Sequence, residues 1–125
     1  MAKDPKPVAL VVEDELFVRM LGIDILESAG FDVLEAATAD EAIDVLQEHT
    51  DVQLLFSDID MPGSMNGLAL AHVVHDRWPK IRLLLTSGYH QLYKAQIPDA
   101  GQFLSKPWTQ QALVAKVQAT MTAQH

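Results

Sequence analysis

Four strand-length runs of buried-type residues in this chain each lead into a polar side chain capable of chemistry. The runs cover residues 8–12, 52–57, 81–85 and 103–105, and the polar residues that follow them are Glu13 with Asp14, Asp58, Thr86 and Lys106. Runs of this length that alternate with helical segments are typical of βαβ units and a parallel sheet. Because the C-terminal ends of parallel strands share one edge, where ligand crevices form, we expect these side chains to meet there.

The hydrophobic pattern places the individual elements. We predict strands at residues 8–12, 31–35, 52–57, 81–86 and 102–105, and helices at 15–29, 39–49, 66–77 and 109–123. A further, marginal helix is expected within residues 89–98, because its apolar spacing is thin and Pro98 ends any helix early. The fold class is therefore α/β, with helices on both faces of a doubly wound parallel sheet.

Local signals support these helices. Thr38 and Glu41 have the spacing of a capping box, and Thr109 is the expected N-cap of the last helix. The predicted core stripes are Val18, Leu21, Ile25 and Ala29 in the first helix and Leu113, Val117 and Met121 in the last.

The composition narrows the class of protein. The 125 residues fit one domain, residues 1–125, with a core at about 7–122. A net charge of −8 argues against nucleic acid as a partner, since phosphate contacts need clustered Lys and Arg. No segment has the roughly 18 apolar residues of a membrane helix, and cysteine is absent. We therefore expect a cytoplasmic protein without a membrane partner.

The polar residues at the strand ends suggest phosphoryl chemistry. Glu13, Asp14 and Asp58 would repel one another when close together unless a cation compensates, and Mg²⁺ prefers such oxygen ligands. Lys106 could pair with a phosphate oxygen or with Asp58, and Thr86 could donate a hydrogen bond. A carboxylate can also serve as the nucleophile and form an aspartyl phosphate. Singly, each residue has an ordinary interpretation, such as a helix cap for Asp14; the combination favours a site.

The motifs in these positions resemble those of the receiver domain of two-component response regulators. They are Val-Val-Glu-Asp-Glu at 11–15, Asp-Ile-Asp-Met-Pro-Gly at 58–63, Asn66-Gly67, Leu-Thr-Ser-Gly at 85–88 and Phe-Leu-Ser-Lys-Pro at 103–107. The resemblance spans about residues 7–122 and implies a flavodoxin-like, three-layer fold with a five-stranded sheet in the order 2-1-3-4-5. The stretch from Pro62 to Gly67 is one residue longer than the commonest loop of the family, and Phe103 stands where tyrosine is frequent.

The resemblance also implies roles for the residues. Asp58 would be the phosphoacceptor, and Glu13, Asp14, Asp58 and the backbone carbonyl of Asp60 would hold Mg²⁺. Lys106 would contact the phosphoryl group, while Thr86 and Phe103 would change position on phosphorylation. The phosphoryl group would come from a phosphohistidine on a histidine kinase or a histidine phosphotransfer protein, and the changed face would bind a downstream protein.

The first helix has more apolar residues than its predicted core stripe uses. Leu16, Met20 and Ile23 lie beside the acidic pair, and we predict that they help to dock the phosphodonor. A wide core stripe or a dimer contact is the alternative, so the chain could be a monomer or a weak dimer.

Other functions remain open at this point. Asp58-Ile59-Asp60 resembles the nucleophile motif of haloacid dehalogenase phosphatases, but those enzymes place the acidic pair last in the chain, whereas here it comes first. A flavin-binding protein of the same sheet order would need a phosphate loop where Glu13 and Asp14 stand. A scaffold that is never phosphorylated is a further alternative. We favour a signalling domain that is no classical enzyme, either standing alone or belonging to a larger regulator.

Overall fold

The computed structural model describes residues 5–88, 96–98 and 101–122, and the five predicted strands lie within them. The elements follow in the order β1 (Val8–Val12), α1 (Leu16–Ser28), β2 (Asp32–Ala36), α2 (Ala39–Glu48), β3 (Val52–Asp58), α3 (Gly67–Arg77), β4 (Arg82–Ser87), β5 (Gln102–Ser105) and α4 (Gln110–Thr122). Each bound lies within one residue of its prediction. Most of the marginal helix expected at 89–98 falls outside the described residues.

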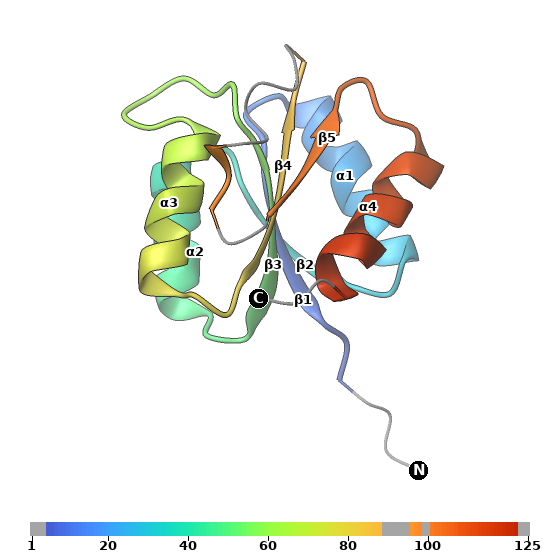
Figure 1. The fold of residues 1–125 in the computed structure, drawn as a ribbon, viewed down its shortest axis with the longest axis horizontal. Coiled ribbons are helices and arrows are strands. Elements are labelled where there is room, and N and C mark those ends of the chain that lie inside the picture. Colours follow the sequence, from blue (N-terminus) through green and yellow to red (C-terminus); the bar gives the residue numbers. More distant parts are fainter. Residues whose placement is uncertain (1–4, 89–95, 99–100, 123–125) are drawn as a thin grey trace.

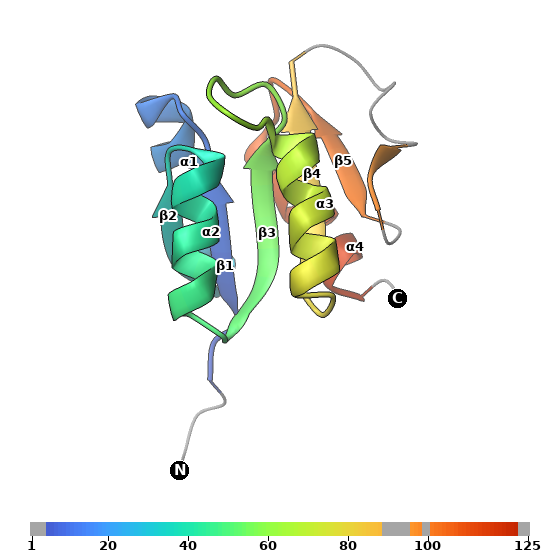
Figure 2. The ribbon, with the colours of Figure 1, turned by 90° about the vertical axis from the view of Figure 1, so that its left-hand side faces the viewer.

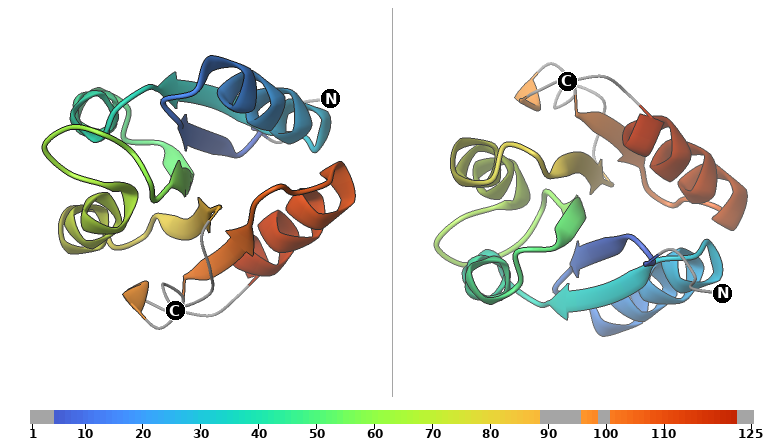
Figure 3. Two further views of the ribbon diagram at one scale, coloured as in Figure 1. Left: turned by 90° about the horizontal axis from the view of Figure 1, so that it is seen from above. Right: turned by 90° about the horizontal axis from the view of Figure 1, so that it is seen from below.

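The strands form one parallel sheet in the order β2-β1-β3-β4-β5, as predicted. Helices α2 and α3 cover one face of this sheet, and α1 and α4 cover the other (Figures 1 and 2). Seen along the strands, the three layers separate clearly (Figure 3). Because β1 and β3 are neighbours while the chain continues from β1 to the outer strand β2, the strand order reverses between β1 and β3. That point is where such sheets open a ligand site.

Two hydrophobic clusters hold the layers together. Alternate residues of a strand point to opposite faces, so Leu10 and Leu55 pack under α2 and α3, whereas Val11 and Phe56 pack under α1 and α4. Strands buried on both faces read as nearly continuous apolar runs, which is why these runs were visible in the sequence.

The helix caps follow the sequence signals. Thr38 Oγ1 accepts the Glu41 N–H at 3.1 Å, and the Glu41 carboxylate accepts the N–H of Ala37, one residue before the expected partner. Thr109 caps α4 by accepting the Ala112 N–H at 3.0 Å. Leu113 and Val117 are buried in α4 as predicted.

The predicted core stripe of the first helix was partly wrong. Helix α1 buries Gly22, Ile25 and Leu26, while Leu21 is 50% exposed and Ala29 is exposed. The helix rests on Gly22, where a Cβ would lie only 3.5 Å from the Phe56 ring. The buried face is therefore centred on Gly22, the residue after Leu21. Glycine has no apolar side chain that would mark this face in the sequence.

A second glycine fixes the start of α3 against the end of β3. A Cβ on Gly67 would lie 1.9 Å from the backbone oxygen of Asp58, and the Gly67 N–H donates to the Ile59 carbonyl at 2.9 Å. Asn66 caps the helix by accepting the Ala69 N–H at 2.9 Å. Any side chain at residue 67 would therefore push the backbone of Asp58.

The two helical glycines should respond differently to replacement by alanine. We expect Gly67→Ala to lower the free energy of unfolding by about 3 kcal/mol, the upper end of typical overpacking. Gly22→Ala would make only ordinary van der Waals contacts, at 3.5 Å or more, and should be neutral or stabilise by up to about 1 kcal/mol through helix propensity. Urea unfolding of both variants measures this, and equal changes would contradict the assignment.

Candidate functional site

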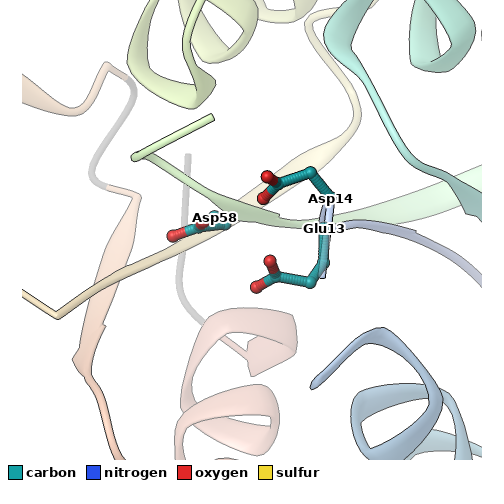
Figure 4. Close-up of side chains that lie close together, drawn as sticks. All are labelled: Glu13, Asp14 and Asp58. Carbon is teal, nitrogen blue, oxygen red and sulfur yellow. The ribbon is translucent and has the colours of Figure 1, made fainter. Parts of the chain in front are cut away.

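Three carboxylates meet at the C-terminal edge of the sheet. Glu13 and Asp14 follow β1, Asp58 ends β3, and one ligand oxygen from each lies within 4.8 Å of the others. Figure 4 shows the three side chains converging on the same space. Glu13 and Asp58 are each only 4% exposed, whereas Asp14 is exposed. The predicted acidic cluster is thus present, with two of its members buried.

Lys106 supplies the nearest positive charge. Its Nζ donates to Glu13 Oε1 at 2.8 Å and lies 3.3 Å from Asp58 Oδ1. Burial alone would lower the pKa of Lys106, but the hydrogen bond to Glu13 and the charge of Asp58 outweigh it and raise that pKa. The lysine therefore stays charged and bridges the two buried acids.

The charge balance at Asp58 is nevertheless unfavourable. Burial, followed by the negative charge of Glu13, raises the pKa of Asp58 from its ordinary value of 3.8 to about 6. Lys106 and the backbone N–H of Asp60 oppose this rise without cancelling it. A further cation would relieve the repulsion, and an all-carboxylate donor set suits a hard divalent ion such as Mg²⁺. The residues therefore fit the metal that the sequence suggested.

The site opens to solvent through a hollow of about 540 Å³. This hollow is lined by Glu13, Asp14, Glu15, Asp58, Asp60, Gly88 and Lys106. A phosphoryl group and its donor could reach Asp58 from this side.

Thr86 lies beside Asp58, but its hydroxyl is bonded to the next strand. The two residues are register partners on β4 and β3, which places the threonine at the predicted edge. Thr86 is 2% exposed, and its Oγ1 donates to the Leu104 carbonyl on β5 at 2.6 Å. Phe103, which we predict to change position together with Thr86, is also buried and belongs to the hydrophobic cluster beneath α2 and α3.

Asp60 is held at the rim of the hollow. The Ser87 hydroxyl donates to Asp60 Oδ2, and Asp60 is partly buried. Its carboxylate thus turns toward the end of β4 instead of pointing freely into solvent. The role of its backbone carbonyl as a metal ligand stays a prediction.

Next to the site, α1 presents an apolar surface. Leu16, Phe17, Met20 and Leu21 are between 50% and 78% exposed. The predicted docking residues Leu16 and Met20 belong to this surface, but Ile23 is partly buried and packs on the core. A small apolar cavity of about 160 Å³ adjoins the surface, lined by Val18, Leu21, Lys106, Pro107 and Trp108. The sequence did not lead us to place Phe17 on this surface, and it led us to assign Leu21 to the core.

The reversal of strand order, the buried acidic cluster, the threonine and the lysine together define an α/β domain whose switch point carries a cluster that could hold a metal ion. Residues 9–118 match the response regulator receiver domain family. The chain belongs to this family, and it is a signalling domain of two-component systems.

Individual proteins are similar to this chain in sequence or in structure. The chain is 34% identical to the sensor kinase CckA of Brucella abortus over 119 residues, covering 92% of this chain and 12% of that protein. It is 33% identical to a chemotaxis protein CheY homolog of Campylobacter jejuni, covering 87% and 88%. A receiver protein structure from Sinorhizobium medicae superposes with a TM-score of 0.86 at 24% identity, covering 94% and 96%.

Several matched proteins are much longer than this chain. It spans 12% of CckA and 46% of the aerobic respiration control protein ArcA of Escherichia coli. Among the described residues, no helix is long and apolar enough to cross a membrane.

The raised pKa of Asp58 has a consequence for stability. The folded protein holds this proton up to about pH 6, while the unfolded chain releases it near the ordinary value of 3.8. The fold therefore loses stability as the pH rises from about 4 to about 6, and it does not regain this stability above that range. Without metal, Asp58→Asn should raise the free energy of unfolding by about 1–3 kcal/mol at pH 7.5.

Urea unfolding at pH 7.5 and pH 4 checks this expectation. The gain should shrink toward zero at pH 4, and saturating Mg²⁺ should reduce it at pH 7.5 because only the wild type keeps the ligand. Asp24→Asn, at an exposed position on α1, serves as the control. A gain that is equal at both pH values would contradict the assigned cause.

Proposed function

We propose that this domain accepts a phosphoryl group on Asp58 from a phosphohistidine, in a Mg²⁺-dependent step of a phosphorelay. The observation that carries the proposal is the buried Asp58 carboxylate, which faces Glu13, Asp14 and Lys106 at the floor of an open hollow. Phosphoryl transfer requires a positioned nucleophile and neutralisation of charge, and Lys106 together with a bound Mg²⁺ would supply that neutralisation here.

The phosphoryl group would move from histidine to Asp58 in a simple displacement. An Asp58 oxygen forms a bond to phosphorus, the phosphorus–nitrogen bond of the phosphohistidine breaks, and its electron pair returns to the imidazole. Asp14 and Asp58, together with Glu13 and the Asp60 carbonyl, would hold Mg²⁺. When bound, the ion supplies neutralisation of charge on the carboxylates and the phosphoryl oxygens. With a pKa of about 6, Asp58 is largely ionised and nucleophilic at neutral pH.

Lys106 and Thr86 would respond to the new group. Lys106 already lies 3.3 Å from Asp58 Oδ1 and can exchange Glu13 for a phosphoryl oxygen. Thr86 can reach a phosphoryl oxygen only if its hydroxyl leaves the Leu104 carbonyl. Since Leu104 and Phe103 are adjacent on β5, loss of the bond from Thr86 to Leu104 would change the face around Phe103. Phosphorylation would thus shift an existing equilibrium between two states and alter the binding of a downstream protein.

The domain would catalyse only its own phosphorylation and dephosphorylation. We expect it to act in the cytoplasm with a histidine kinase or a histidine phosphotransfer protein. The apolar surface of α1 stands beside the hollow, so a helical phosphodonor could pack on Leu16, Phe17, Met20 and Leu21 while its histidine reaches Asp58.

The first test is direct phosphorylation. Incubation with Mg²⁺ and a small phosphodonor such as acetyl phosphate should add one phosphoryl group, seen as a shift in intact mass. Asp58→Asn and removal of Mg²⁺ with EDTA should each abolish the shift. Modification that persists in Asp58→Asn would place the phosphoacceptor elsewhere.

The docking surface can be tested separately. Replacing Leu16 and Met20 together by lysine should slow transfer from a phosphorylated histidine phosphotransfer protein at least tenfold, because two apolar contacts of about 1–2 kcal/mol each are lost. Phosphorylation by acetyl phosphate should be unchanged. Lysines at the exposed positions Ala115 and Gln118 on α4 make the matched control. Equal loss with both phosphodonors would argue against docking here.

A further inference from the structure

We propose that Arg19 is a positioning residue for the metal site, which holds the turn carrying Glu13 and Asp14 in its binding geometry. The inference rests on the proposed function, because it concerns the affinity of the same site for Mg²⁺. Arg19 lies on α1, and it bonds the expected ligand Glu13 at the backbone carbonyl and not at the carboxylate.

The contacts of Arg19 are well defined. Its Nη1 donates to the backbone carbonyl of Glu13 at 2.8 Å, and its Nε donates to Glu35 Oε1 at 2.9 Å. The arginine side chain is 14% exposed, whereas Glu35 is 57% exposed. The planar guanidinium fork can make both bonds at once, which an ammonium could not do in the same geometry. Arg19 on α1 therefore joins this helix to the turn after β1 and to β2.

The bonded carbonyl controls the direction of Asp14. The Glu13 carbonyl and the Asp14 N–H and Cα belong to one planar peptide unit, so fixing the carbonyl oxygen fixes that plane. Asp14 is the exposed member of the cluster, and its backbone begins with this peptide unit. An ion that needs several oxygens at set distances gains affinity when this plane is held before it binds.

Glu13 itself is restrained at every polar atom. Its N–H donates to the Ala36 carbonyl at 3.1 Å, and its carboxylate accepts from Glu15 N–H at 3.1 Å and from Lys106 at 2.8 Å. Arg19 supplies the bond to the remaining group, the carbonyl oxygen. Loss of Arg19 would leave this oxygen without its donor and free the turn to rotate.

Removal of Arg19 has two effects on the affinity for Mg²⁺, one through its charge and one through its position. Arg19 is a fixed positive charge close to the acidic cluster, so by Coulomb's law alone its removal should tighten the binding of Mg²⁺. Loss of positioning should weaken the binding, because partners that orient metal ligands typically contribute about 10–100-fold in affinity. The two effects are opposite in direction.

The experiment is a Mg²⁺ titration by isothermal calorimetry of the whole chain at constant ionic strength, without a phosphodonor. Arg19→Met should raise the Kd for Mg²⁺ by about tenfold or more. Glu35→Gln, which keeps the bond from Arg19 to Glu13, should change it by no more than about twofold, since exposed ion pairs contribute little. Circular dichroism confirms that each variant is folded.

A second readout needs no metal. Hydrogen exchange of the Glu15 amide, which is bonded to the Glu13 carboxylate, should be faster in Arg19→Met than in the wild type. If Arg19→Met does not fold, Arg19→Lys replaces it: this variant keeps the charge, so a weakened Mg²⁺ affinity again supports positioning. Unchanged or tighter Mg²⁺ binding in a folded variant overturns the inference alone. A wild type that binds no Mg²⁺ overturns the proposed function, and the inference with it.

Discussion

The mutual repulsion of Glu13, Asp14 and Asp58 is the constraint around which this site is built. The sheet order places the ends of β1 and β3 side by side, and burial removes the water that would screen Glu13 and Asp58. Lys106 compensates only in part, as the raised pKa of Asp58 shows. The two hydrophobic clusters that hold the sheet between its helices maintain this costly arrangement, and a bound cation would relieve the same imbalance.

Helix α1 lies between the exposed apolar surface and the acidic turn after β1. One side of it rests on Phe56 through Gly22, its Arg19 holds the turn after β1, and its outer side presents apolar residues beside the hollow. A protein that packs on α1 therefore contacts the element that orients the acidic turn. The proposed docking surface and the proposed metal site would then share one helix as their support.

The sequence predicted most of the fold and the core of the site for a common physical reason. In a parallel sheet the inner strands are buried on both faces, so most strands appear as apolar runs, and the residue after such a run lies at the edge where ligand sites form. Asp58, Thr86 and Lys106 were found in this way. The pattern could not show that α1 packs through a glycine, and this led to the wrong placement of Leu21. It also could not reveal the bond from Arg19, because backbone acceptors leave no trace in the residue types.

The base of the segment after Ile59 has a consequence for how related chains can vary. The Ile59 carbonyl accepts the N–H groups of both Met61 and Gly67, at 3.0 Å and 2.9 Å. The segment between them thus leaves and rejoins the end of β3 at one carbonyl oxygen, and its Ser64 hydroxyl also donates to Asp40 on α2 at 3.0 Å. The length of this segment could therefore change with little effect on β3, which would accommodate the additional loop residue that the resemblance to the family implies.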